Sequence, residues 1–152
     1  MPSFDDVAAI ALTLPGVTEE AFGQGGGRGW KVRDKGFVWE RPLRKGDLAA
    51  LGDAAPKGAI LGVRTADLAM KEALLASDPA VFFTIPHFEG YPAVLVQLGK
   101  IRKPLLRDII VEAWLARAPA RLANAYLAER DAAAPKQPVS RARPRSGTRA
   151  SR

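Results

Sequence analysis

The amino-acid sequence changes character after Asp131, and this change restricts folding to the part before it. Residues 132–152 are rich in alanine, proline, serine and arginine and contain a single branched aliphatic residue, Val139. Such a segment buries too little apolar surface to offset the entropy that is lost when it becomes ordered. We therefore expect one folded domain over residues 1–131 and a disordered basic tail over residues 132–152.

The basic charge of the chain is concentrated in that tail. The sequence has 23 Lys and Arg against 16 Asp and Glu, which gives a net charge of +7 and an isoelectric point near 10.1. Residues 132–152 carry six of the bases and no acid, so residues 1–131 hold 17 bases and 16 acids. The tail is either an arm that attracts nucleic-acid phosphates or a solubilising extension. Specific recognition by the nearly neutral domain therefore requires a local arrangement of bases.

The sequence lacks the residues that several kinds of site need. It has no cysteine and one histidine, His87, which excludes disulfide frameworks, thiolate metal sites and paired-histidine zinc sites. The glycine-rich run Gly23–Gly29 precedes a strand pattern and has no Lys-Ser/Thr ending, so it is typical of an inter-strand loop and not of a phosphate-binding loop. No serine lies in a nucleophile-elbow pattern. We predict a protein that is not an enzyme, with no catalytic residue, no cofactor and no metal.

The sequence also gives no sign of a membrane protein. No apolar run reaches the roughly 18–20 residues of a membrane span, and the segment Met1–Asp6 lacks the basic and apolar regions of a signal peptide. We expect a cytoplasmic protein with no membrane contact.

Four helices are predicted from caps, prolines and apolar spacing. Ser3 with Asp5 and Asp6 indicates a helix start, and Leu14-Pro15-Gly16 indicates its end. Thr65 or Asp67 caps a second helix that ends near Ala76. A long helix begins near Pro104 and is interrupted at Pro119, and Ala120–Arg130 continue as a further helical piece.

The strands are predicted from short apolar and β-branched runs between turn residues. A hairpin joins Gly29–Val32 to Gly36–Glu40, with Gly36 available for a positive φ. The remaining strand candidates are Ala59–Arg64, Val81–Thr84 and Ala93–Leu98. Arg41–Gly58, between the hairpin and the next strand, reads as a loop with one helical turn.

The candidate nucleic-acid contacts are bases near the hairpin and residues of the later loop. In the hairpin, basic residues are interleaved with Trp30, Phe37 and Trp39, which resembles a surface that contacts nucleobases. The plainer interpretation is a strand whose basic residues lie on the solvent-exposed face. The loop Thr84–Pro92 exposes an imidazole beside a phenol, which is consistent either with a binding role or with packing of the loop onto the sheet. The six candidates are Lys31, Arg33, Lys35, Arg64, His87 and Tyr91.

Several motifs occur in an order that resembles the MmcQ/YjbR family, over about residues 3–130. The most specific is the loop Pro86–Pro92, which reads Pro-His-Phe-Glu-Gly-Tyr-Pro and lies between the expected strand and helix blocks. The other motifs are Leu14–Glu20, Lys35–Phe37, Lys71–Leu75, Asp78-Pro79 with Phe82–Thr84, and Trp114 with Ala118-Pro119 and Arg121-Leu122.

The resemblance implies an α+β fold similar to the CyaY-like (frataxin-like) architecture. In that two-layer fold an antiparallel sheet packs against an N-terminal helix and C-terminal helices, and it has also been likened to a double-wing DNA-binding domain. Frataxin-type iron binding depends on an acidic first helix. Here that helix offers only Asp5 and Asp6, so iron binding is not carried over.

Two functions follow as expectations. The first is a non-enzymatic, monomeric DNA-binding protein that uses the six candidates, with the tail adding non-specific attraction. The alternative is a protein-interaction or small-ligand-binding module centred on Thr84–Pro92, which requires an apolar pocket or patch beside His87.

Overall fold

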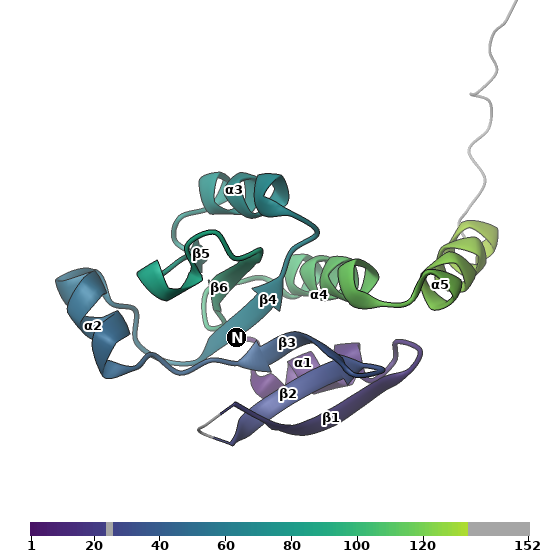
Figure 1. The fold of residues 1–152 in the computed structure, drawn as a ribbon, viewed down its shortest axis with the longest axis horizontal. Coiled ribbons are helices and arrows are strands. Elements are labelled where there is room, and N and C mark those ends of the chain that lie inside the picture. Colours follow the sequence, from purple (N-terminus) through teal and green to yellow (C-terminus); the bar gives the residue numbers. More distant parts are fainter. Residues whose placement is uncertain (24–25, 134–152) are drawn as a thin grey trace, which may run out of the picture.

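A computed structural model describes residues 1–23 and 26–133 and contains one six-stranded antiparallel sheet (Figure 1). The predicted tail, residues 132–152, lies outside the described residues except for its first two positions. The strands lie side by side in the order β1-β2-β3-β4-β6-β5. Their bounds are β1 Val17–Phe22, β2 Gly27–Val32, β3 Lys35–Glu40, β4 Ile60–Arg64, β5 Phe82–Phe83 and β6 Ala93–Gln97.

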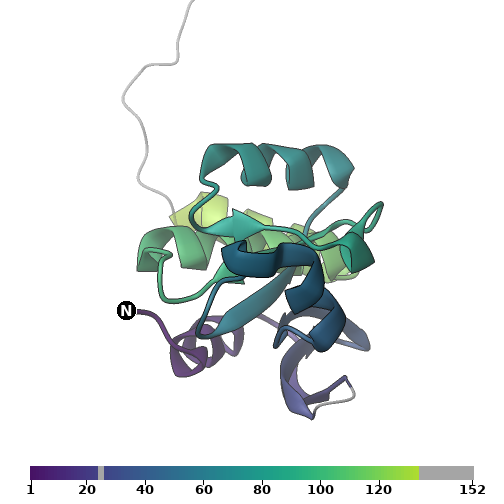
Figure 2. The same ribbon diagram turned by 90° about the vertical axis from the view of Figure 1, so that its left-hand side faces the viewer.

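Within the described residues five α-helices accompany the sheet, and their arrangement is visible from the side in Figure 2. Their bounds are α1 Phe4–Ala11, α2 Lys45–Leu51, α3 Leu68–Ser77, α4 Lys103–Arg117 and α5 Ala120–Ala133. The sheet with an N-terminal helix and C-terminal helices confirms the predicted α+β class.

The larger hydrophobic core lies between the sheet and α1 and α4. Val7 of α1, Ile110 and Trp114 of α4, and Trp30 and Val63 of the sheet are fully or almost fully buried in it. Leu74 and Leu75 of α3 pack against the same core. Burial of side chains of this size contributes about 1.5–3 kcal/mol each, so this cluster supplies most of the driving force for folding.

A smaller core lies on the opposite face of the sheet. It consists of the buried residues Trp39, Ile60, Ile85, Phe88, Ala93 and Leu95. The short helix α2 and the loop between β5 and β6 contribute to its cover, with Leu51 and Phe88 packing inward. This face is less completely covered by helices than the other, and it carries the site described below.

The β2–β3 hairpin corrects one detail of the prediction. The positive φ falls on Arg33 (φ 58°), within the two-residue turn, and not on Gly36. The register shifts between Trp30 and Lys31, so that Phe37 is an extra residue on β3. Phe37 and Val38 are both buried in the larger core as a result.

The first helix has the predicted cap but is shorter than expected. The Ser3 side chain accepts a hydrogen bond from the amide of Asp6, whose carboxylate accepts from the Ser3 amide, and the helix ends at Ala11, three residues before Leu14. The Ser3 amide and Lys103 lower the pKa of the Asp6 carboxyl group.

Arg28 of β2 connects α1 to the edge of the sheet. Its guanidinium contacts Asp5 at 2.8 Å and Glu19 at 2.7 Å, and Glu19 also accepts the indole N–H of Trp30 at 3.0 Å. The hydrogen bond from Arg28 lowers the pKa of the Glu19 carboxyl group.

Candidate functional site

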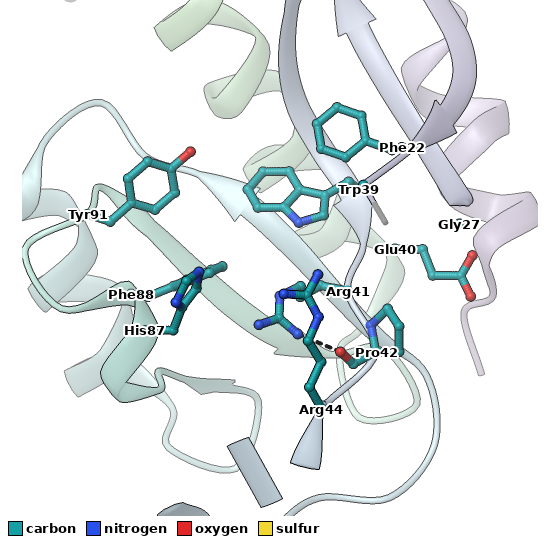
Figure 3. A pocket seen from close by; sticks show the side chains of 11 residues that line it. Phe22, Gly27, Trp39, Glu40, Arg41, Pro42, Arg44, His87, Phe88 and Tyr91 are labelled. Atoms are coloured by element: carbon teal, nitrogen blue, oxygen red, sulfur yellow. Dashed lines mark hydrogen bonds between the residues drawn. The ribbon is translucent and has the colours of Figure 1, made fainter. Parts of the chain in front are cut away.

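An open groove lies over the smaller core, where β3 meets the loop between β5 and β6 (Figure 3). Its volume is about 620 Å³, which is within the range of small-molecule sites. The aromatic residues that line it are Phe22, Trp39, His87, Phe88 and Tyr91, and the charged ones are Glu40, Arg41 and Arg44.

Three glycines give Phe22 and Trp39 room to lie against the sheet. A Cβ atom at Gly29 would lie 2.5 Å from Phe22, and one at Gly36 would lie 2.7 Å from the same ring. A Cβ atom at Gly62 would lie 2.5 Å from the Trp39 indole. The two rings stack with their centroids 5.7 Å apart, so the glycines allow an aromatic floor that larger residues would displace.

The aromatic floor continues into the loop between β5 and β6. Phe88, in the 3₁₀ turn Pro86–Phe88, lies 6.4 Å from Trp39 and 5.5 Å from Tyr91 between ring centroids. Phe88 is buried and fastens the loop to the sheet, whereas Tyr91 is 39% exposed. The imidazole of His87 is exposed and makes no hydrogen bond to the described residues. The loop therefore combines packing with an accessible polar edge.

Lys71 of α3 holds the same loop from the other side. Its side chain is buried, and its ammonium group donates to the main-chain oxygens of Phe88 at 2.5 Å and Tyr91 at 2.7 Å. Burial lowers the pKa of the Lys71 amine, while the two carbonyl oxygens accept from two of its three donors. The position of the loop therefore depends on a residue that does not line the groove.

Two arginines lie at the β3 side of the groove. Arg41 is buried, pairs with the buried Asp47 of α2 at 3.0 Å, and places its guanidinium 5.7 Å from the Phe88 ring centroid. Arg44, just before α2, is exposed; its main-chain amide donates to the Asp47 carboxylate at 2.9 Å, but its guanidinium forms no ion pair among the residues that the structure describes. The Glu40 carboxylate accepts the amide of Arg28 at 3.1 Å.

A second basic feature lies at the end of the sheet where the β2–β3 hairpin turns. Antiparallel pairing brings the start of β3 beside the end of β4 and the start of β6, which places Lys35, Arg64 and Tyr91 at the same end. The Trp114 indole donates to the carbonyl oxygen of Pro15, just before β1, so the C-terminal end of α4 with Arg117 is also there. We call Arg33, Lys35, Arg64 and Arg117 the basic end.

Arg64 and Arg117 are the central pair of the basic end. Arg64 donates to the carbonyl oxygen of Pro92 at 3.2 Å and to the Tyr91 hydroxyl at 3.4 Å, with its guanidinium 5.0 Å from the Tyr91 ring centroid. The Nε atom of Arg117 is buried and has no hydrogen-bond partner in the described part of the chain. Burial, with a smaller contribution from the charge of Arg64, lowers the pKa of Arg117. Cations in this arrangement favour an anion.

The structure places five of the six sequence candidates in these two places and Lys31 in neither. His87 and Tyr91 line the groove, and Tyr91 also contacts Arg64 of the basic end. Arg33 and Lys35 lie in and after the hairpin turn and do not line the groove. Lys31 lies 3.6 Å from the Glu20 carboxylate and 5.9 Å from the Phe22 ring centroid, so its charge is partly neutralised.

Sequence reasoning missed Arg44, Arg117 and the role of Trp39 in the groove. An available signal for rings lying on the sheet was the recurrence of glycine within strand segments, at Gly29, Gly36 and Gly62. The proximity of Arg64 to Arg117 had no such signal, because the two lie 53 residues apart in the sequence and come together only through the packing of α4.

Residues 1–23 and 26–133 lack two kinds of feature. No group of three or more His, Cys, Asp or Glu side chains is arranged to hold a metal ion. No helix in this part of the chain combines the length and apolar character that crossing a membrane requires.

Comparison with known proteins identifies relatives of the chain. The family model described as YjbR matches residues 12–116. The chain is 48% identical over 131 residues to uncharacterized protein Mb2600 of Mycobacterium bovis and to uncharacterized protein Rv2570 of Mycobacterium tuberculosis, and the alignment covers 84% of this chain and 98% of each relative. No solved structure matches the chain significantly.

Proposed function

The chain belongs to the YjbR family, and from that premise we propose that it is a non-enzymatic DNA-binding protein whose basic end contacts the phosphate backbone. The observation that carries the proposal is the arrangement of Lys35, Arg64 and Arg117 at one end of the sheet, with no carboxylate within 4 Å of any of them among the described residues. Phosphate contacts supply most of the affinity of non-specific DNA binding.

The basic end offers cations of different character. Arg64 is oriented by Pro92 and Tyr91, so its guanidinium is already ordered before it meets a phosphate. Arg33 and Lys35 are exposed at the hairpin and extend the charge along the sheet end. The six bases in residues 132–152 add attraction that does not depend on sequence. The proposal includes a monomeric protein in the cytoplasm. A chain without cysteine is compatible with that reducing compartment.

The proposal is tested by titrating a fluorescent DNA duplex with the full chain at two salt concentrations. The variant Lys35→Gln/Arg64→Gln/Arg117→Gln is compared with Lys57→Gln/Lys100→Gln/Arg107→Gln, which removes the same charge from exposed positions away from the basic end. We expect only the first variant to lower the slope of log affinity against log salt, by about 3, because each phosphate contact contributes about 0.9. Equal losses in both variants would show that only bulk charge attracts the DNA.

The groove beside His87 favours a second candidate function, a small-ligand module centred on Thr84–Pro92. Its cavity, aromatic floor and exposed imidazole are features of a ligand site, and none of them requires DNA. DNA binding and ligand binding can be tested by different substitutions, because Lys35, Arg64 and Arg117 do not line the groove.

A further inference from the structure

Trp39 differs from the other two tryptophans in what its indole nitrogen does. Trp30 donates to Glu19 at 3.0 Å and Trp114 donates to the carbonyl oxygen of Pro15 at 3.1 Å. The Nε1–H of Trp39 makes no hydrogen bond within residues 1–23 and 26–133, although the side chain is only 8% exposed. Trp39 Nε1 is not among the fully buried unpaired atoms of the described residues, so this donor is open to the surface and can pair with a bound group.

The unpaired donor belongs to the groove. Figure 3 shows the indole nitrogen on the side of the ring that faces Arg41, with Arg44 beyond it and Tyr91 across the opening. Trp39 and both arginines line the same cavity. Two guanidinium groups and an N–H group therefore converge on one side of the groove, and all of them are donors.

The other side of the groove offers flat apolar surface. Phe88 and Tyr91 meet edge to face, and Phe22 stacks on Trp39 at the far end. An aromatic ring that lies in the groove against these side chains makes contacts with π-faces and edges, an arrangement that is worth more than the buried area alone. The Glu40 carboxylate, near Gly27, is the one acid lining the described cavity, and it already accepts the Arg28 amide.

We propose that the groove binds a small molecule that has a flat ring and a carboxylate or phosphate group, with the ring against Tyr91 and Phe88 and the anion on Arg44, Arg41 and Trp39 Nε1–H. This inference rests on the second candidate function and is independent of DNA binding. Arg41 is largely neutralised by Asp47, so Arg44 supplies the free charge and Arg41 supplies oriented donors. The Trp39 ring lies against Gly62 and the Phe22 ring lies against Gly36. These close contacts keep both rings in place for this role.

The test follows the three indole N–H resonances of the full chain in a two-dimensional ¹⁵N NMR spectrum, with Trp39 assigned through Trp39→Phe. The probes are adenosine 5′-monophosphate against adenosine, and indole-3-acetate against indole-3-acetamide. The pairs distinguish phosphate from carboxylate as the anion. We expect the acids to shift the Trp39 resonance, leave those of Trp30 and Trp114 in place, and bind about tenfold more tightly than their neutral counterparts.

The variant Arg44→Gln removes the free charge from an exposed position, and Arg121→Gln is the matched control on α5. We expect Arg44→Gln to abolish the preference for the acids and Arg121→Gln to keep it. Equal binding of the neutral and acidic probes would overturn the anionic ligand and leave the ligand module standing. No shift of the Trp39 resonance with any probe would overturn both.

Discussion

Lys71 of α3 donates a hydrogen bond to the main-chain oxygen of Tyr91, 20 residues further along the chain, at 2.7 Å. With the parallel bond to Phe88, this contact ties a helix at the edge of the fold to the loop that carries both His87 and Tyr91. The groove and the basic end therefore share a support, because Tyr91 lines the first and contacts Arg64 of the second.

We expect Lys71→Met to destabilise the protein by about 1–3 kcal/mol, because it removes two hydrogen bonds from a charged donor and leaves the carbonyl oxygens of Phe88 and Tyr91 with one main-chain donor each. Urea unfolding followed by circular dichroism measures the change. Lys57→Met, at an exposed position, is the control. An unchanged unfolding midpoint in Lys71→Met would show that the loop holds its position without this support.

Gly62→Ala is expected to cost about 1–3 kcal/mol, because the added methyl group would lie 2.5 Å from the rigid Trp39 indole. Gly46→Ala in α2 meets nothing within 4 Å and is expected to be neutral or slightly stabilising. Thermal unfolding gives the stability difference, and near-ultraviolet circular dichroism reports the environment of the three tryptophans, of which Trp39 is the one that contacts Gly62. A fully stable Gly62→Ala variant with an unchanged tryptophan signal would contradict the close contact.

Glu19→Gln is expected to remove a pH-dependent part of the stability. Arg28 lowers the pKa of the folded-state carboxyl group below the usual 4.5, so the stabilisation is complete above that value and is lost as the pH falls through the lowered pKa. Wild type should exceed the variant in unfolding free energy by a constant amount from neutral pH to about pH 5, and the gap should close in more acid solution. Glu129→Gln on α5 is the control. A gap that does not change with pH would exclude the ion pair as its source.

Local features of the sequence explain why much of the fold could be predicted. The Ser3 cap, the Asp67 cap of α3 and the break at Pro119 involve residues within one or two turns of each other, and each occurs where expected. The hairpin was also recognised, but its positive φ was assigned to Gly36 instead of Arg33. Gly36 matters for another reason: because it has no side chain, the Phe22 ring can lie against it.

The candidate site could be predicted only in part, because it depends on contacts between distant segments. His87 and Tyr91 were recognisable from the unusual loop that contains them, and both line the groove. The donor of that loop, Lys71, lies on another element. The pairing of Arg41 with Asp47 was likewise hidden, because nothing in the sequence indicates that a basic residue at the end of a strand is buried and neutralised.

The most direct measurement for DNA binding by the basic end is the change in backbone amide NMR shifts when a short duplex is added to the full ¹⁵N-labelled chain. We expect the largest changes at Arg33–Lys35, Arg64–Thr65 and Arg117, with smaller ones in residues 132–152 and little change in α1. Changes confined to residues 132–152 would contradict the proposal, because they would show that the tail alone attracts the DNA and that the folded domain does not contact it.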